Sequence, residues 1–201
     1  MGFKASGRRK GNDPNIIGGS NAQQGQEREN YNKVLRETKK KEIAQEMMSV
    51  KDFQTEIVAP ACRHLEMHSV SAVNLLVGTA VHESNLFYLR QLDEGPALGF
   101  FQMEPDTHDD IWGNYVDYRA DLSEKMLDLS VGEPSAEQLK WNLLYSAAMA
   151  RIHYARVPQP LPHHRDPVGM ARYWKQHYNT HLGAGLVEEF ERSYRKYVVV
   201  H

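Results

Sequence analysis

Apolar residues recur at helical spacing in several stretches of the chain, and each stretch predicts a helix. Residues 53–67 carry one apolar face, and Pro60 within them is expected to kink the helix. Residues 70–82 are nearly all apolar or small, which is typical of a central helix buried on every side. The apolar face of the first stretch consists of Phe53, Ile57, Val58, Ala61 and Leu65.

The last third of the chain predicts two more helices. Ser135-Ala136-Glu137-Gln138 has the pattern of a capping box, so we expect a helix from there to about Arg156, where a proline-rich stretch stops it. A second helix is predicted from about Asp166 to His181, with Pro167 in its first turn. The stopping prolines are Pro158, Pro160 and Pro162.

Glycine and proline between Leu89 and Phe101 predict either a small hairpin or a loop. With that exception the pattern is helical. We therefore expect a mainly α domain over residues 52–201.

Residues 1–51 differ from this body. The first 30 residues contain six glycines and only one aromatic residue, Phe3, so they bury too little apolar surface to fold alone. Residues 27–50 are strong helix formers with a sparse apolar stripe, which fits either a helix that packs on a neighbour or a solvated linker. The stripe consists of Tyr31, Val34, Leu35, Ile43 and Met47.

The distribution of charge supports the same division. The 201 residues sum to a formal charge of −2, yet residues 1–51 hold 11 Lys+Arg and 6 Asp+Glu, a net of +5, which leaves −7 for the body. This asymmetry indicates a basic arm and an acidic domain with different roles. The body is long enough to bury a core of its own.

Several classes of protein are excluded or disfavoured. No apolar run approaches the roughly 18–20 residues that span a bilayer. The single cysteine, Cys62, excludes an internal disulfide and a cysteine-rich zinc site. The basic N-terminus is followed by no apolar segment, so we expect no secretory signal peptide.

Glu83 is the first candidate for chemistry. It follows the most apolar predicted helix, where a low-dielectric wall would raise the pKa of its carboxyl. A glutamate held near neutrality can donate a proton to a leaving oxygen. Taken alone, a carboxylate at a helix end more often caps a backbone or faces water.

The residues after Glu83 favour the catalytic interpretation. Glu83-Ser84, followed by Ala97-x-Gly99-Phe100-Phe101-Gln102-x-x-Pro105-x-Thr107, resembles the catalytic segment of the lytic transglycosylase and goose-type lysozyme superfamily, and Gln102 lies 19 residues after Glu83. The chain departs from the family pattern at Pro96, at Phe100-Phe101 and at Glu104.

Two later blocks also resemble the family. The stretch that begins with Trp141-Asn142-Leu143 resembles a helix of the family in which an asparagine precedes small residues that pack under the site. Tyr178-Asn179 matches a block whose tyrosine lies near the catalytic glutamate, although Thr180-His181 replace the usual Ala-Gly. The resemblance spans roughly residues 70–183 and implies a lysozyme-like helical fold, similar to soluble lytic transglycosylases.

The resemblance implies cleavage of the β-1,4 bond between N-acetylmuramic acid and N-acetylglucosamine in peptidoglycan. In lytic transglycosylases one glutamate, here Glu83, acts first as acid and then as base, and a 1,6-anhydro ring forms without water. The residues expected to bind the substrate or to orient Glu83 are Ser84, Phe101, Gln102, Tyr178 and Asn179.

Asp93 and Glu94 leave a second chemistry open. They lie between the two blocks, and if either activates a water molecule opposite Glu83, the enzyme is a hydrolase of goose-lysozyme type. Otherwise they are loop charges beside Gly95-Pro96. A third alternative is a virion adaptor protein that keeps the fold without needing activity.

We expect no cofactor and no metal. His64 and His68 have the i, i+4 spacing of a ligand pair, but no third ligand is evident. The expected partner of the body is a peptidoglycan glycan strand, and that of residues 1–51 is a set of phage structural proteins. Arg8-Arg9-Lys10 is expected to be solvated rather than to bind nucleic acid. The expected location is a phage virion that opens the cell wall when its genome passes into the host.

Overall fold

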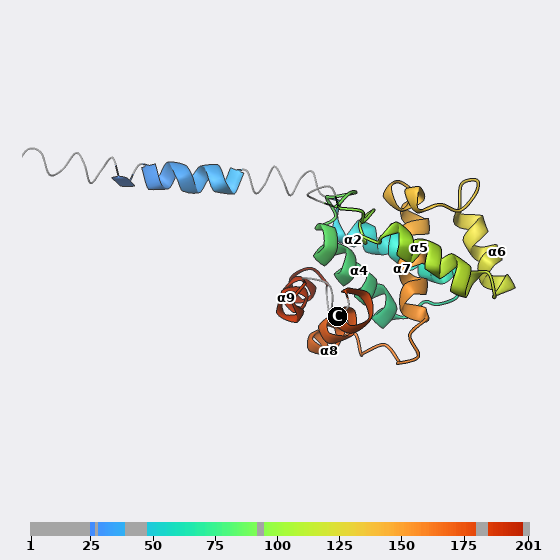
Figure 1. Ribbon diagram of the computed structural model, residues 1–201. Helices are drawn as coiled ribbons and strands as arrows, with labels where there is room; N and C mark the ends of the chain where they lie inside the picture. Colours follow the sequence, from blue (N-terminus) through green and yellow to red (C-terminus); the bar gives the residue numbers. More distant parts are fainter. Residues whose placement is uncertain (1–24, 27, 39–47, 92–94, 180–184, 199–201) are drawn as a thin grey trace, which may run out of the picture. The chain divides into compact units, whose positions relative to one another are not determined.

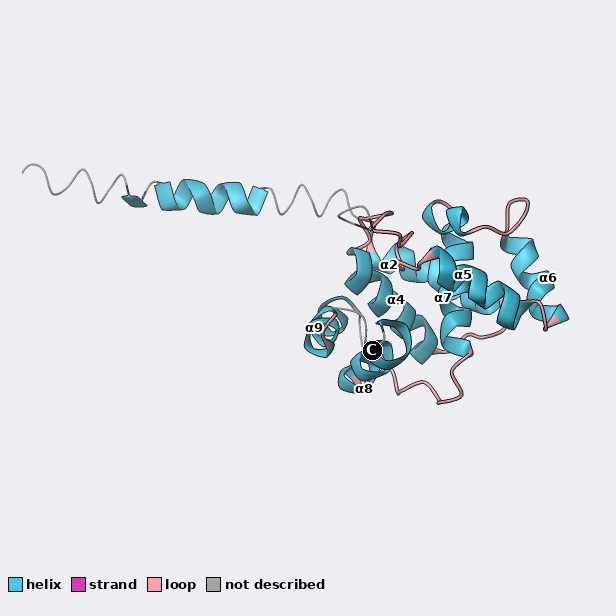
Figure 2. Cartoon of the chain, in the orientation of Figure 1, coloured by secondary structure: helices cyan, strands magenta, loops and turns pink. Residues whose placement is uncertain are grey.

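The fold is given by a computed structural model that describes residues 25–26, 28–38, 48–91, 95–179 and 185–198. The chain divides into two units, residues 1–46 and residues 47–201, and each is described by itself (Figure 1). The described part is mainly helical and contains no strand, as the sequence predicts for the body (Figure 2).

The second unit contains eight α-helices and four short segments of other helical types within the described residues. The α-helices are α2 (Val50–Asp52), α3 (Ala59–His64), α4 (Val70–Ser84), α5 (Pro105–Ile111), α6 (Ala120–Leu129), α7 (Leu143–Ala155), α8 (Pro167–Trp174) and α9 (Val187–Tyr197). Phe53–Val58, Trp112–Val116 and Lys175–Asn179 are π-helical, and Ala136–Lys140 is a 3-10 helix.

Helix α4 lies at the centre, as its apolar sequence predicts, and most of its residues are buried. Ser69 caps its first turn by accepting a hydrogen bond from the backbone of Ala72 at 3.0 Å. Helices α8 and α9 pack against it on one side, and α3 and α7 contact it elsewhere (Figure 1). The last turn of α4, which carries Glu83, contacts α8 and α9 through the His82 ring, which packs against Trp174 and Phe190.

Close packing of α9 on α4 depends on Gly78. A Cβ atom at this position would lie 2.8 Å from the ring of Tyr194 and 3.1 Å from that of Phe190, both on α9. Phe190 and Tyr194 are fully buried in this contact, although α9 is otherwise charged.

The helix predicted over residues 53–67 is present as a continuous helical path from Val50 to His64. The residues directly before Pro60 have π-helical hydrogen bonding, in which the Ala59 N–H donates to the carbonyl of Gln54. A proline lacks an N–H and disturbs the hydrogen bonding of the preceding turn, so a change of helical type at this place is understandable.

The capping-box prediction is wrong in its details. Ser135 makes no side-chain cap, the segment after it is a 3-10 helix, and α7 begins only at Leu143. The true cap is Asn142, whose side chain accepts from the Tyr145 N–H at 3.2 Å. Gln138 is buried and holds the preceding loop, since its amide bonds Ser130, Val131 and Glu133.

The helix predicted from Asp166 is confirmed as far as Asn179, and residues 180–184 lie outside the described part. Asp166 caps it by accepting from the Gly169 N–H at 2.9 Å, with Pro167 in the first turn. The predicted hairpin is reduced to single bridges of Leu98 with Arg90 and with Met103.

In the first unit, residues 28–38 are helical, which agrees with the predicted helix as far as it is described. Tyr31, Val34 and Leu35, the members of the apolar stripe that the structure describes, are exposed. Within the described residues of both units, no helix combines the length and the apolar character needed to cross a membrane.

Candidate active site

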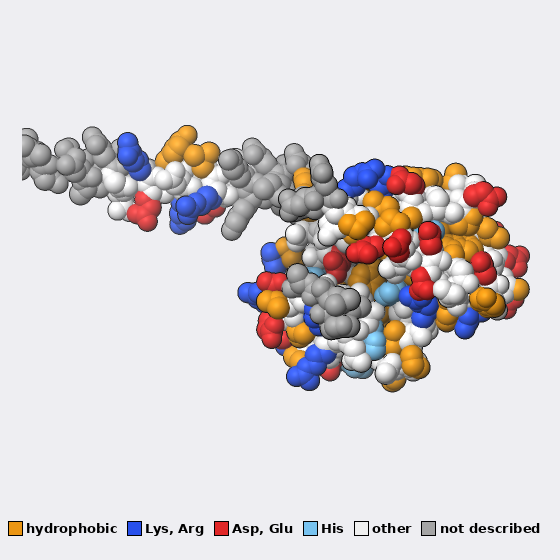
Figure 3. Space-filling model, in the orientation of Figure 1, with side chains coloured by type: hydrophobic (Ala, Val, Ile, Leu, Met, Phe, Trp, Pro, Cys, Tyr) orange, Lys and Arg blue, Asp and Glu red, His pale blue; other side chains and the backbone are white. Residues whose placement is uncertain are grey.

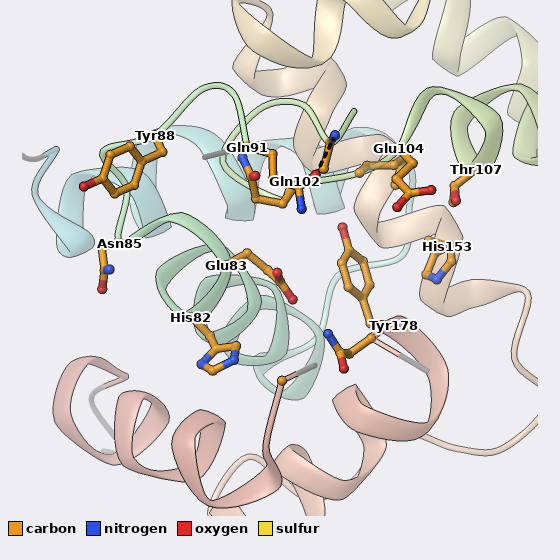
Figure 4. A pocket seen from close by; sticks show the side chains of 14 residues that line it. His82, Glu83, Asn85, Tyr88, Gln91, Gln102, Glu104, Thr107, His153 and Tyr178 are labelled. Carbon is orange, nitrogen blue, oxygen red and sulfur yellow. Dashed lines mark hydrogen bonds between the residues drawn. The ribbon is translucent and has the colours of Figure 1, made fainter. Parts of the chain in front are cut away.

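Glu83 is in the last turn of α4 and faces an open groove (Figure 4). The helix ends at Asn85, which adopts a left-handed conformation (φ 52°) and donates its N–H to the carbonyl of Val81. Asparagine tolerates this conformation better than most residues. The end of the helix, and with it the position of Glu83, is therefore well defined.

Burial raises the pKa of the Glu83 carboxyl from 4.5 to about 7. A hydrogen bond from the Trp174 indole, whose Nε1 lies 3.0 Å from Oε1 of Glu83, acts in the opposite direction because it favours the ionised form. The protonated and the ionised carboxyl are thus both well populated at neutral pH. A carboxyl in this state can give a proton and take one back.

The Trp174 indole is itself fixed by packing. It is fully buried, stacks on Phe190 with ring centroids 4.9 Å apart, and contacts the edge of the His82 ring at 4.5 Å. The hydrogen bond to Glu83 therefore comes from a donor with little freedom to move.

Tyr178, one of the residues expected to bind the substrate or to orient Glu83, lines the groove but does not hydrogen-bond Glu83. Its hydroxyl donates to the carbonyl of Phe101 at 2.8 Å, and Trp174, one helical turn earlier, bonds Glu83 instead. Burial and the charge of Glu83 hold the pKa of Tyr178 well above its usual value, so the phenol remains protonated.

Two histidines in the groove wall are neutral at pH 7. Burial lowers the pKa of His82, and burial together with Arg156 lowers that of His153 to about 4. His153 Nε2 lies 2.9 Å from the carbonyl of His177, which can only accept, so Nε2 carries the hydrogen and Nδ1 accepts from Arg156 at 3.2 Å. These histidines therefore add no positive charge that would ionise Glu83.

Gln102 lies across the groove from α4. Its side-chain Nε2 donates to the carbonyl of Gly99 at 2.8 Å, and its own backbone is left-handed (φ 46°). Gly99 is also left-handed (φ 71°), and a Cβ atom there would lie 2.0 Å from the carbonyl oxygen of Leu139. The tight turn at residues 99–102 thus holds Gln102 in the groove wall, and its expected role in binding substrate stays a prediction.

Two predicted substrate-binding residues lie behind the groove instead. Ser84 is 1% exposed, and its hydroxyl donates to the carbonyl of Ala80 and accepts from the Leu86 N–H. Phe101 is also 1% exposed and packs on Phe53, with ring centroids 5.9 Å apart. Both predictions are corrected: Ser84 stabilises the turn after α4, and Phe101 belongs to the core.

Asn179, also expected to bind substrate, lines the groove, and its side-chain oxygen accepts from Lys175 at 2.7 Å. Asp93 and Glu94, the candidate second carboxylates, lie outside the described residues. Glu104, which sequence reasoning noted only as a departure from the family pattern, lines the same groove as Glu83.

The groove has a volume of about 590 Å³. In Figure 4, Asn85 and Tyr88 lie on one side of Glu83, while Glu104, Thr107 and His153 lie on the other. Histidine and acidic side chains gather near the middle of the face drawn in Figure 3. The lining residues are His82, Glu83, Asn85, Tyr88, Gln91, Ala97, Gln102, Met103, Glu104, Thr107, His153, Tyr178, Asn179 and Gly185.

Sequence reasoning missed Trp174 and His153 as members of the site. Trp174 precedes Tyr178 by four residues and shares its helix face, which was an available signal. No local pattern marks His153, because its place depends on the packing of α7 beside residues 175–179.

Comparisons with known proteins give no match: no family model, no curated protein and no solved structure is significantly similar to the chain. The described residues also contain no group of three or more His, Cys, Asp or Glu side chains arranged to hold a metal ion.

Proposed function

We propose that the protein is a peptidoglycan lytic transglycosylase with a lysozyme-like helical domain. The observation that carries this proposal is the partly buried Glu83, with a pKa of about 7, inside a groove open to solvent. A proton donor of this kind is what cleavage of a glycosidic bond requires.

In the proposed reaction, the protonated Glu83 gives its proton to the oxygen of the β-1,4 bond as the bond to C1 of N-acetylmuramic acid breaks. The resulting Glu83 carboxylate then takes the proton of the C6 hydroxyl of the same sugar, and that oxygen bonds to C1. The products are a free 4-hydroxyl on one fragment and a 1,6-anhydro ring on the other, and the acid is regenerated.

The rest of the groove suits a polar sugar chain. Gln102 and Asn179 offer amide groups to acetamido and hydroxyl groups. A groove that extends on both sides of Glu83 suits a polymer cut in its interior (Figure 4).

The test is digestion of purified peptidoglycan by the wild type and by Glu83→Gln, with the products analysed by mass spectrometry. The expected result is anhydro products from the wild type and about a hundred- to ten-thousandfold less product from the variant. Glu56→Gln, which removes an exposed carboxylate outside the groove, is the matched control and should cleave normally. Equal cleavage by Glu83→Gln and Glu56→Gln would refute the assignment.

Glu104 favours hydrolysis as a second candidate. It occupies the N-cap position of α5 but makes no side-chain cap, and its carboxylate is directed into the groove (Figure 4). A carboxylate opposite the acid can activate water, as in inverting glycosidases. This chemistry would be established if the wild type gave products with reducing ends instead of anhydro ends and Glu104→Gln gave no such products. No products of either kind would favour the adaptor protein.

We also propose a place in a phage particle, with residues 1–51 as the attachment segment. Support comes from the basic charge of this arm, of which residues 1–46 form a unit separate from the one that carries the groove. Mass spectrometry of purified virions should detect the protein, and its absence there would refute this location.

A further inference from the structure

The segment directly after α4 has a strained backbone. Asn85 and Leu86 are both left-handed, with φ of 52° and 53°. A left-handed leucine is unfavourable because its Cβ crowds the following carbonyl. Hydrogen bonds from the backbone N–H groups of Phe87 and Tyr88 to the carbonyl of Ser84, at 3.0 and 3.3 Å, help to hold this turn.

The turn buries Leu86 and leaves the next three large apolar side chains in solvent. Phe87 is 43% exposed, Tyr88 37% and Leu89 41%. The Phe87 and Tyr88 rings contact each other edge to face, with centroids 5.0 Å apart. Contiguous exposed apolar side chains on a strained turn are typical of a binding site.

This aromatic pair is continuous with the groove of Glu83. Tyr88 lines the groove, and Figure 4 shows it on the same side of Glu83 as Asn85. Gln91 also lines the groove there, and its side-chain oxygen accepts from the Ala97 N–H at 3.2 Å, which leaves its amide NH₂ as a donor. Aromatic rings beside amide groups offer a sugar both an apolar face and hydrogen bonds.

We propose that Phe87 and Tyr88 form a sugar-binding platform for the part of the glycan strand that lies beyond Asn85. The proposal rests on the proposed function and adds a binding site at a distance from the reacting bond. Its consequence is a preference for long strands, because a short fragment that fills only the region around Glu83 does not reach the platform.

The experiment measures binding in a Glu83→Gln background, in which substrate persists. Sedimentation with insoluble peptidoglycan gives the affinity for long strands, and titration with a soluble tetrasaccharide of the same sugars gives that for short ones. Addition of Tyr88→Ala should lower the affinity for long strands about tenfold and that for the tetrasaccharide much less. Tyr88→Phe should retain most of the affinity, because the ring remains.

The matched control is Tyr118→Ala, which removes another tyrosine that is 78% exposed and lies outside the groove. It should bind like the background, and thermal unfolding should show that all variants are folded. If Tyr88→Ala binds long strands as well as Tyr118→Ala does, the platform is refuted while the proposed function stands. If the wild type neither binds nor cleaves peptidoglycan, the proposed function fails and the platform with it.

Discussion

The raised pKa of Glu83 predicts that this carboxyl destabilises the protein at neutral and alkaline pH. Burial raises its pKa from 4.5 to about 7, so the folded state holds the proton more tightly than the unfolded state does. Replacement by Gln keeps the size of the side chain and an oxygen that can accept from Trp174, but removes the titration. Glu83→Gln should therefore be more stable than the wild type above pH 7.

The magnitude follows from linkage. Below pH 4.5 Glu83 is protonated in both states and contributes no dependence on pH. Between pH 4.5 and 7 the unfolded chain has released the proton while the folded protein keeps it, so unfolding becomes easier by about 1.4 kcal/mol for each pH unit. Above pH 7 both states are ionised and the penalty stays constant. From pH 5 to pH 8 the wild type should lose about 2–3 kcal/mol relative to Glu83→Gln.

The assay is urea unfolding of both proteins at pH 5 and pH 8, followed by circular dichroism. Other titrating groups affect both proteins alike, so the difference between the two free energies of unfolding isolates Glu83. A difference that is equal at the two pH values would refute the buried environment of Glu83. This measurement needs no substrate and is independent of any activity.

Two further changes test neighbouring features. Trp174→Phe removes the hydrogen bond that favours ionised Glu83, so the alkaline limb of the pH profile of the proposed cleavage reaction should move upward by roughly 0.5–1 pH unit; a downward movement would contradict the role of the indole. Gly99→Ala should destabilise the protein by at least about 2 kcal/mol, because the position is left-handed and the new Cβ would collide with the Leu139 carbonyl. Gly113→Ala, which adds a Cβ in open space, should change the thermal unfolding midpoint little, and equal losses in both variants would contradict this account.

The sequence predicts helices best where local signals agree with tertiary packing. Helix α4 is apolar on every side, and the structure buries it on nearly every side. The start of α8 depends only on neighbouring residues, because Asp166 caps the first turn and Pro167 lies within it. Where a local signal competes with a tertiary one, the prediction fails. The Gln138 amide forms hydrogen bonds with the loop before it and does not cap a helix. The capping-box pattern at residues 135–138 therefore does not mark the start of α7.

Helices α5, α6 and α9 were not identified individually, although α9 carries a readable pattern. Phe190 and Tyr194 are spaced i, i+4 in a charged stretch, which is the usual signature of a helix with one buried face.

At the site, Glu83, Gln102, Tyr178 and Asn179 were all named from the sequence, and all four line one groove. The sequence did not predict the hydrogen-bond partner of each side chain. Trp174 and Tyr178 lie one turn apart on the same helix face. The sequence pattern alone therefore does not show which of the two rings bonds Glu83. Packing on α9 decides between them, because Phe190 stacks on the indole and keeps its N–H directed at Glu83.

The acidity of Glu83 thus depends on contacts that begin far from the groove. Gly78 lets α9 approach α4 closely, α9 places Phe190 against Trp174, and Trp174 gives Glu83 the hydrogen bond that offsets part of the effect of burial. The same burial that raises the pKa of Glu83 destabilises the folded protein once the carboxyl ionises, so the core around α4 has to supply the compensating stability. The close contact at Gly78 and the stack of Phe190 on Trp174 therefore help to set the pKa of Glu83 as well as the fold.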